Sequence, residues 1–260
     1  MKYEKELYAA IEAGLKAKKV VLDYYHNGFD VEIKSDNSPV TDADKAADKI
    51  IREYLGNRFK DYAFLTEESV DNKDRLSNDY VWIVDPVDGT KDFVAKDDEF
   101  TINIGLAYKH KVVVGVVVIP AKDLLYYASE GNGAYVFKDG ESTKIHVNDK
   151  LTDLTCYTSV FHFTDEEKSL IASHSDRIKH VLPLGSSIKP CYIANGKGEI
   201  TLRLNDGTKE RDTCAFQCIV EEAGGLVLKP DKTPITYNRE DVYNRDGYIV
   251  INRIENFILK

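Results

Sequence analysis

Several hallmarks of common protein classes are missing from this chain of 260 residues. No apolar run approaches the roughly 20 residues that a transmembrane helix needs, so we expect no membrane partner. The first residues form a charged amphipathic pattern without the apolar core of a signal peptide, which predicts a cytoplasmic protein. The net charge of −9 disfavours a nucleic-acid partner, because nucleic-acid binders need a basic face.

Cysteine is scarce as well. The four cysteines, Cys156, Cys191, Cys214 and Cys218, include no CxxC pair. Cys214 and Cys218 lie four residues apart, on one face of a helix, and no histidine lies near them to suggest a zinc site. We expect buried free thiols in a reducing compartment.

What is present is typical of a folded globular protein. Hydrophobic residues make up 43% and charged residues 30%, and the length allows one large domain or two smaller ones. The stretch 139–151 is polar and rich in turn residues, which indicates a boundary. We expect an α+β half over residues 1–145, an α/β half over 146–260, and a site between them.

The spacing of apolar residues indicates a layered α/β fold. It predicts helices at 3–26, 42–58, 187–195 and 213–223, with glycines at the ends of the first and last. An extended segment at 31–34 and a polar loop at 35–39 separate the first two helices. Strands are predicted at 63–65, 80–84, 100–108, 112–119, 124–129, 133–137, 155–160, 180–184, 200–204, 226–228 and 248–251, those from 100 to 137 as an antiparallel meander.

The most informative stretch follows the strand at 80–84, which reads as buried on both faces. Asp85 and Asp88 come at its end, split by Pro86, and Gly89 and Thr90 follow at once. The two carboxylates could converge on hard cations while the next backbone N–H groups face an anion. The alternative is an ordinary turn rich in aspartate, and spacing alone does not decide between them. Bound cations would reverse the sign of an acidic site, so a net negative charge is compatible with an anionic substrate.

Three other acidic motifs each have two interpretations. Glu67 and the residue after it form either a solvated loop or a metal ligand shared with Asp85. Thr41 and Asp44 fit a capping box at a helix start, or Asp44 orients a hydroxyl that activates water. Asp212 fits an N-cap for the helix at 213–223, or a metal ligand at its end. Capping is the simpler interpretation of Asp44 and Asp212 taken alone.

Two further segments carry polar groups without a clear local role. His174 lies in a polar loop, where an exposed histidine usually has no special function. Residues 185–189 open a helix, and the Ser186 hydroxyl and Lys189 suit an anion there, although serine at a helix start is usually a cap.

Four motifs taken together resemble one family. They are similar to the motifs of the lithium-sensitive, magnesium-dependent phosphatases of the inositol monophosphatase family. The four motifs are the segments 37–44 and 66–69, Asp-Pro-Val-Asp-Gly-Thr at 85–90, and Asp-Thr-Cys-Ala at 212–215. They occur in the family's order and span nearly the whole chain. The resemblance implies an αβαβα sandwich with two mixed or antiparallel sheets.

The resemblance also implies two or three Mg²⁺ ions. The family's ligands carry over to Glu67, Asp85, the backbone carbonyl of Val87, Asp88 and Asp212. One ion would lie among Glu67, Asp85 and Val87, and a second among Asp85, Asp88 and Asp212. Li⁺ would occupy the second position. Most ligands lie in the half 1–145, and the half 146–260 would supply substrate contacts and the last ligand.

The chemistry implied by the resemblance is direct attack of water on phosphorus. The Thr90 hydroxyl, oriented by Asp44, would help to deprotonate a metal-bound water, and Glu68 would support a weaker third ion. The expected partner is a small phosphorylated substrate. Its contacts would come from Asp88, Gly89, Thr90, His174, Ser186, Lys189, Arg203 and Asp212.

Several details resemble the bisphosphate nucleotidase branch of the family. Lys91 and Asp92 follow the motif at 85–90, as a lysine and an acidic residue do in that branch. Lys189 and Arg203 match nucleotidase positions, and His174 matches a loop near the nucleoside. The implied reaction is hydrolysis of 3'-phosphoadenosine 5'-phosphate to AMP and phosphate. The alternatives are an inositol monophosphatase, a broad sugar phosphatase such as fructose-1,6-bisphosphatase, or a binding protein that keeps the fold.

One residue departs from the family pattern. The family has tryptophan immediately before the last aspartate, and this chain has Arg211. An aromatic wall is lost and a cation is gained, which either favours a more anionic ligand or pairs with Glu210. Nothing in the sequence separates a monomer from a homodimer.

Overall fold

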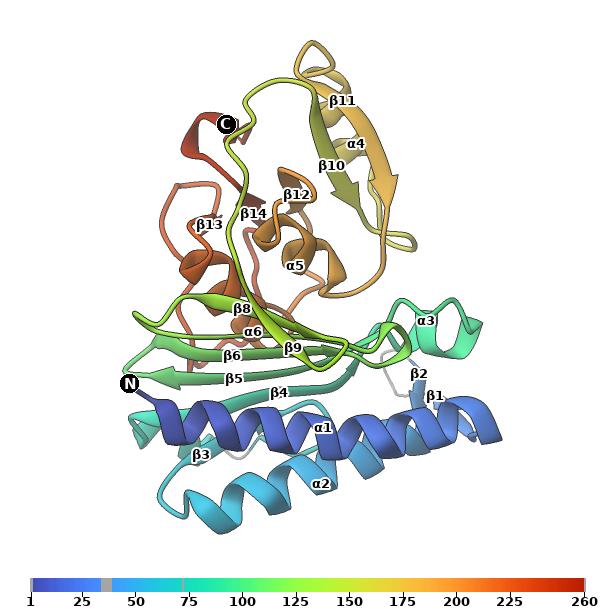
Figure 1. The fold of residues 1–260 in the computed structure, drawn as a ribbon, viewed down its shortest axis with the longest axis vertical. Helices are drawn as coiled ribbons and strands as arrows, with labels where there is room; N and C mark the ends of the chain where they lie inside the picture. The colour runs from blue at the N-terminus through green and yellow to red at the C-terminus, as the bar shows by residue number, and fades with distance from the viewer. Residues whose placement is uncertain (1, 34–38, 72, 260) are drawn as a thin grey trace.

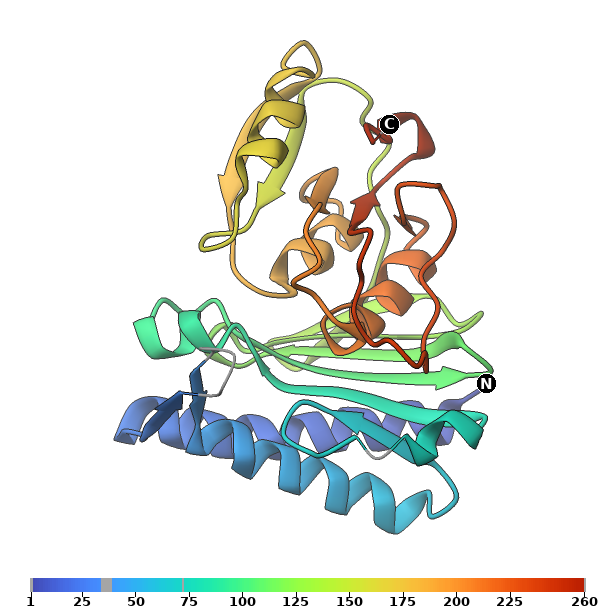
Figure 2. The same ribbon diagram turned by 180° about the vertical axis from the view of Figure 1, so that it is seen from behind.

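Two β-sheets and the helices around them form alternating layers in the computed structural model, which describes residues 2–33, 39–71 and 73–259 (Figures 1 and 2). The helices are α1 (Glu4–Asn27), α2 (Asp42–Arg58), α3 (Thr90–Ala95), α4 (Asp165–Ala172), α5 (Ile188–Ala194) and α6 (Glu210–Glu222), with 3-10 turns at Asp74–Ser77, Pro120–Lys122 and Ile254–Asn256. Helices α1 and α2 cover the outer face of the larger sheet, and α5 and α6 lie between the two sheets.

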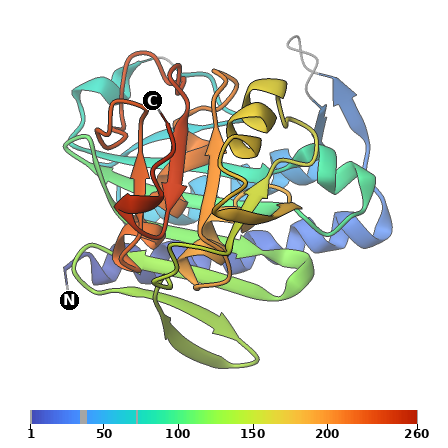
Figure 3. The same ribbon diagram turned by 90° about the horizontal axis from the view of Figure 1, so that it is seen from above.

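The larger sheet has seven strands in the order β3-β4-β5-β6-β7-β8-β9. Its strands are β3 (Ala63–Thr66), β4 (Tyr80–Asp88), β5 (Thr101–Tyr108), β6 (Lys111–Ile119), β7 (Leu124–Ser129), β8 (Ala134–Lys138) and β9 (Glu141–Ile145). Only β3 and β4 pair in parallel, and the rest is the predicted antiparallel meander extended by β9. Strands β8 and β9 project at one side of the molecule (Figure 3).

The second sheet has five strands in the order β11-β10-β12-β14-β13. They are β10 (Leu154–Thr158), β11 (Ile178–Pro183), β12 (Ile200–Arg203), β13 (Leu226–Leu228) and β14 (Tyr248–Ile251). The first three pair in parallel and the last two antiparallel, so the sheet is mixed. A separate antiparallel pair joins β1 (Val31–Ile33) and β2 (Pro39–Thr41).

Strand β4 is buried on both faces, as its uninterrupted apolar run predicts. Successive side chains alternate between faces: Trp82 and Val84 belong to the core that contains α1 and α2, and Val81 and Ile83 belong to the core that contains α5 and α6. All four are fully buried. Strand β4, which carries the start of the motif at 85–90, is therefore packed tightly on both faces.

Helix α6 lies against the larger sheet on two glycines. Gly105 on β5 and Gly115 on β6 face each other across the ladder. A Cβ atom added at Gly105 would lie 2.5 Å from the Sγ of Cys214, and one at Gly115 would lie 2.9 Å from the Cβ of Cys218 and closer still to the Ala215 carbonyl. These contacts leave no room for a side chain, so the two glycines set how closely α6 approaches the sheet.

Most of the predicted elements are confirmed, and the differences are specific. The expected strand end at Asp85 is wrong, because β4 continues through an irregularity to Asp88. Helix α6 begins at Glu210 and not at residue 213. Strand β9 and helices α3 and α4 have no counterpart in the sequence prediction. Of the expected loop at 35–39, residues 35–38 lie outside the described residues, and Pro39 begins β2.

Two other expectations can be compared directly with the structure. All four cysteines are free and buried, as predicted, and burial raises the pKa of the Cys156 thiol to about 12. None of the described helices combines the length and the apolar character that crossing a membrane requires.

Candidate metal centre

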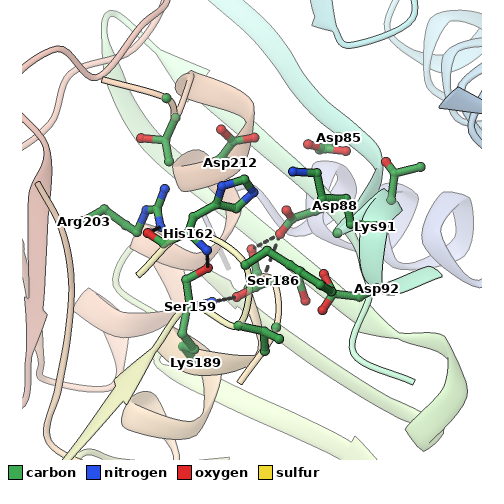
Figure 4. A pocket seen from close by; sticks show the side chains of 18 of the residues that line it. Asp85, Asp88, Lys91, Asp92, Ser159, His162, Ser186, Lys189, Arg203 and Asp212 are labelled. Atoms are coloured by element: carbon green, nitrogen blue, oxygen red, sulfur yellow. Dashed lines mark hydrogen bonds between the residues drawn. The ribbon is translucent and has the colours of Figure 1, made fainter. Parts of the chain in front are cut away.

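A cavity of about 470 Å³ opens where the end of β4, the turn before α5 and the start of α6 meet (Figure 4). It is lined on one side by Asp85, Asp88 and Asp212, and on the other by Lys189 and Arg203. The cavity thus brings together segments that lie far apart in the chain. We call the side of the three aspartates the acidic wall and the side of Lys189 and Arg203 the basic wall; the cation of Arg211 lies among the carboxylates of the acidic wall.

The acidic wall has the geometry of a metal centre. Asp85, Asp88 and Asp212 each offer a carboxylate oxygen, and these three atoms all lie within 4.8 Å of one another. Asp85 is buried and its Oδ1 has no hydrogen-bond partner. Burial, followed by the nearby carboxylates of Glu67 and Asp88, raises the pKa of Asp85 well above its usual range. Buried, mutually repelling oxygen donors with an unfilled acceptor fit a hard divalent cation such as Mg²⁺.

Asp88 is oriented by donors from two other segments. Its Oδ2 accepts hydrogen bonds from the Ser187 N–H at 2.9 Å and hydroxyl at 2.8 Å, from the Asn103 amide at 3.1 Å and from the Thr101 hydroxyl at 3.2 Å. These bonds use one carboxylate oxygen and leave Oδ1 for the cavity. Outer partners of this kind fix a ligand's direction and strengthen metal binding.

Asp212 follows the same pattern. Its Oδ2 accepts the Lys209 backbone N–H at 2.7 Å, which satisfies one unpaired donor at the start of α6. The predicted N-cap position is wrong: Lys209 is the N-cap, and Asp212 is the third helical residue. An N3 side chain can bond back to the N-cap with one oxygen and expose the other, and here the second oxygen, Oδ1, lies 3.8 Å from Arg211 Nε.

The capping box predicted for Asp44 is present, and the same carboxylate also reaches Thr90. Its Oδ2 accepts bonds from the Thr41 N–H at 2.8 Å and hydroxyl at 2.5 Å. The Thr90 hydroxyl lies 3.4 Å from Asp44 Oδ1 and 3.2 Å from the Val87 carbonyl oxygen. Burial raises the pKa of Asp44 to about 6, against the lowering effect of the bonds from Thr41. The two interpretations of Asp44 therefore do not exclude each other.

The opposite wall is basic and partly buried. The Lys189 ammonium donates to the carbonyls of Leu184 at 3.0 Å and Ser186 at 2.8 Å. Burial lowers the pKa of Lys189 to about 8, although the charge of Asp88 opposes the shift. The Arg203 guanidinium donates to the His162 carbonyl at 2.8 Å. Donors held this way face the same space as the carboxylates, as Figure 4 shows for Lys189 and Arg203.

Ser186 lies beside these donors in a strained conformation. Its φ of 43° is in the left-handed region, and its buried hydroxyl has no hydrogen-bond partner. Gly89 lies close by: a Cβ atom there would meet the Ser186 Cβ at 3.2 Å. The turn before α5 and the end of β4 are therefore packed tightly together.

The structure corrects one expected site residue. His174 lies after α4 and does not line the cavity; its ring is bonded to the Leu170 carbonyl at 3.0 Å. His162, in the loop after β10, lines the cavity instead. Burial and nearby cations, Lys91 first, lower the pKa of His162 to about 4, so its ring is neutral near pH 7. No local sequence signal marks His162.

Arg211 is the unexpected member of the acidic wall. Its Nη2 lies 3.0 Å from Glu67 Oε1, and its Nε lies 3.4 Å from Asp85 Oδ2 and 3.8 Å from Asp212 Oδ1. The alternative pairing with Glu210 is wrong, because Glu210 is fully buried and pairs with Arg239 at 3.1 Å. Arg211 therefore faces the candidate ligands themselves.

Comparisons with known proteins agree with this geometry. A profile of the family described as "Inositol monophosphatase family" matches residues 2–256. The protein named 3'(2'),5'-bisphosphate nucleotidase CysQ of Escherichia coli (strain K12) is 33% identical over 223 residues, which cover 85% of this chain and 89% of that protein. The protein of the same name from Buchnera aphidicola subsp. Acyrthosiphon pisum is 36% identical over 203 residues, 76% of this chain and 74% of that protein.

The fold comparison leads to the same group of proteins. The crystal structure of CysQ from Bacteroides thetaiotaomicron, described as a bacterial member of the inositol monophosphatase family, matches with a TM-score of 0.83 and 34% identity. The match covers 97% of this chain and 99% of that one. The sequence and structure similarities thus extend over nearly the same full length and include both sheets.

Proposed function

This chain belongs to the inositol monophosphatase family, and we propose that it hydrolyses the 3'-phosphate of 3'-phosphoadenosine 5'-phosphate, giving AMP and phosphate. The observation that carries the proposal is a pair of cations in the cavity, Lys189 and Arg203, whose hydrogen bonds go to backbone carbonyls and Asn205 and not to the candidate metal ligands. A substrate with two phosphates needs two anion sites, one at the metals and one away from them. The relatives named as bisphosphate nucleotidases support this choice within the family.

The acidic wall receives the phosphate that is cleaved. We assign Mg²⁺ to the oxygens of Glu67, Asp85, Val87, Asp88 and Asp212, in two or three ions. The bound ions would supply Lewis-acid stabilisation of the reacting phosphate and a lowered pKa for the attacking water. The Thr90 hydroxyl would accept a proton from the attacking water and pass its own proton to the Asp44 carboxylate, to which it donates a hydrogen bond. Gly89 and Thr90 would offer backbone N–H groups to the phosphate. Sensitivity to Li⁺ is part of this proposal.

The basic wall holds the second phosphate. Lys189 supplies a buried ammonium, and Arg203 supplies a planar pair of donors that suits phosphate. Ser186, with its unpartnered hydroxyl, adds a neutral donor. None of these groups is within the acidic cluster, so their removal should change substrate choice and leave the chemistry at the metals intact.

Comparison of three substrates tests the proposed function. We expect kcat/KM for 3'-phosphoadenosine 5'-phosphate to exceed that for inositol 1-phosphate and for fructose 1,6-bisphosphate. The Lys189→Ala variant should lose about 10²-fold on the nucleotide bisphosphate, because a charge-assisted bond to phosphate and a buried cation are both removed. It should lose less than about threefold on a monophosphate such as 2'-AMP. Phosphate release under saturating Mg²⁺ measures both.

Equal losses on both substrates would contradict the assignment of Lys189 to a second phosphate. Preference for inositol or sugar phosphates would favour the alternative activities within the family. A binding protein without activity would release phosphate from none of the three.

The depressed pKa of Lys189 gives a pH signature. The ammonium binds phosphate only while protonated, so affinity for the bisphosphate is present below pH about 8 and falls as the pH rises through that value. The substrate's phosphates do not change charge in this range, since their second pKa lies near 6. We expect the ratio of KM values for the bisphosphate and for 2'-AMP to rise between pH 7.5 and 9.5. In Lys189→Arg the ratio should stay flat, and a rise in that variant too would contradict the assignment.

A further inference from the structure

Arg211 occupies an unfavourable position for a cation. It is the second residue of α6, and the start of a helix carries a partial positive charge that repels basic side chains. Its side chain is nevertheless mostly buried, with 17% exposed. The helix does not stabilise the guanidinium there, so the compensating interactions must come from elsewhere.

The compensation comes from the candidate metal ligands. The guanidinium spans Glu67, Asp85 and Asp212 at 3.0, 3.4 and 3.8 Å. Burial lowers the pKa of Arg211, but the charges of the three carboxylates together outweigh burial and raise it, so Arg211 stays a cation at every working pH. One positive charge thus stands among three carboxylates, in the position where a divalent cation would neutralise them better.

The fit of the guanidinium to these carboxylates is incomplete. The Nη2–Glu67 pair is the shortest of the three, and the buried Arg211 Nε forms no hydrogen bond although Asp85 Oδ2 lies 3.4 Å away. The second carboxylate oxygen of Asp85, Oδ1, has no hydrogen-bond partner either. A well-formed pair between arginine and a carboxylate makes two parallel bonds. This arrangement leaves donors and acceptors unsatisfied, and so can be exchanged for a small ion that coordinates oxygen directly.

We propose that Arg211 is an internal cation that holds Glu67 and Asp85 before the metal binds and must leave them when the metal binds. The inference rests on the proposed function, because it assumes that these carboxylates are metal ligands. Arg211 therefore raises the metal concentration that the protein needs, since part of the metal's binding free energy is used to break its ion pairs. In the metal-free state its positive charge also offsets the mutual repulsion of these carboxylates.

The displaced side chain has a place to go. Arg211 lines the cavity, and so do Asn205 and Thr208 from the loop before α6. A guanidinium released from Glu67 can turn into this space, where it would face the phosphorylated substrate. Metal binding then converts a group that pairs with the ligands into one that meets the substrate.

Metal binding by calorimetry tests the proposal without using activity. We expect Arg211→Gln to bind Mg²⁺ about tenfold more tightly than the unaltered chain. Without metal its thermal unfolding midpoint should fall by several degrees, because the carboxylates lose their cation. At saturating Mg²⁺ the two midpoints should converge. Equal or weaker binding by the variant would overturn the proposal.

Two variants separate direct contact from general electrostatics. Arg203→Gln removes a cation from the same cavity, but Arg203 contacts the His162 carbonyl and Asn205 and none of the carboxylates. It should tighten Mg²⁺ binding by less than about threefold, and a gain equal to that of Arg211→Gln would overturn the proposal. Should Arg211→Gln fail to fold without metal, Arg211→Met purified with Mg²⁺ and then stripped serves in its place, with the same expected ordering.

The same titrations distinguish the failure of this inference from that of the proposed function. Measurable Mg²⁺ binding that is equal in the unaltered chain and the Arg211 variants contradicts only the role of Arg211. Absence of Mg²⁺ binding in all of them contradicts the metal centre itself. A substrate panel with no nucleotide preference contradicts the substrate assignment and leaves the Arg211 result standing.

Discussion

Replacing Asp88 with asparagine is expected to lower kcat by at least about 10³-fold, beyond the roughly 10- to 100-fold effect of losing an outer partner of a metal ligand. The amide oxygen can take the Oδ2 position and still accept hydrogen bonds from the donors around it, so the side chain keeps its orientation. What it loses is the negative oxygen directed at the cavity. Steady-state phosphate release and Mg²⁺ titration measure the loss.

The matched control is Asn103→Ala, which removes one donor to Asp88 and keeps the carboxylate. It should cost only about 10- to 100-fold. In the absence of metal, Asp88→Asn should also unfold at a higher temperature than the unaltered chain, because one of the mutually repelling charges is gone. Retention of activity in Asp88→Asn, or a loss no greater than that in Asn103→Ala, would show that Asp88 is not a ligand.

Replacing Gly115 with alanine is expected to reduce both stability and metal affinity. The new methyl group would collide with the Ala215 carbonyl and lie 2.9 Å from the Cβ of Cys218, so α6 must move away from the sheet. Overpacking of this kind costs about 3 kcal/mol. Because Asp212 lies at the start of α6 and its partners Asp85 and Asp88 lie on the sheet, the same movement should weaken Mg²⁺ binding by about tenfold or more.

A second glycine provides the control. Gly56 lies in α2, and a Cβ atom there would be 3.8 Å from the Phe64 ring, an ordinary contact. Gly56→Ala should be neutral or slightly stabilising, because alanine favours a helix. Metal titrations are made well below both unfolding midpoints. An unchanged Mg²⁺ affinity in Gly115→Ala would mean that the glycine serves packing alone.

The sequence predicted those parts of the fold whose signals are local. The apolar run before Asp85 predicted that β4 is buried, and the spacing of Thr41 and Asp44 predicted the capping box. Helix α4 could have been found in the same way, because Thr164 and Glu167 form a capping box of the same spacing. Strand β9 could not, because it is short, polar and mostly exposed, and it forms only by pairing with β8.

The residues of the candidate site likewise differ in whether a local sequence signal marks them. Asp85 and Asp88 could be identified because one strand carries both. His162 could not be identified, because it meets the other cavity residues through the tertiary fold: its carbonyl accepts a hydrogen bond from Arg203, 41 residues away in the sequence. The partners of Arg211 were also beyond prediction, since Glu67 and Asp85 lie far from it in the sequence and meet it only when α6 is seated on the larger sheet. Local motifs name the chemistry, and the long-range packing decides which other side chains join it.

The paired glycines beneath α6 have a consequence for how this chain can vary. Gly105 and Gly115 precede residue 145, whereas Cys214 and Cys218, which fill the space above them, follow it. A recombinant joined at that point from two distant homologues would place one parent's helix on the other parent's sheet. The close packing of α6 on the sheet would be lost, and with it the spacing between Asp212 on α6 and the aspartates on the sheet. Exchange of segments between relatives is therefore constrained most by a contact that contains no charged group at all.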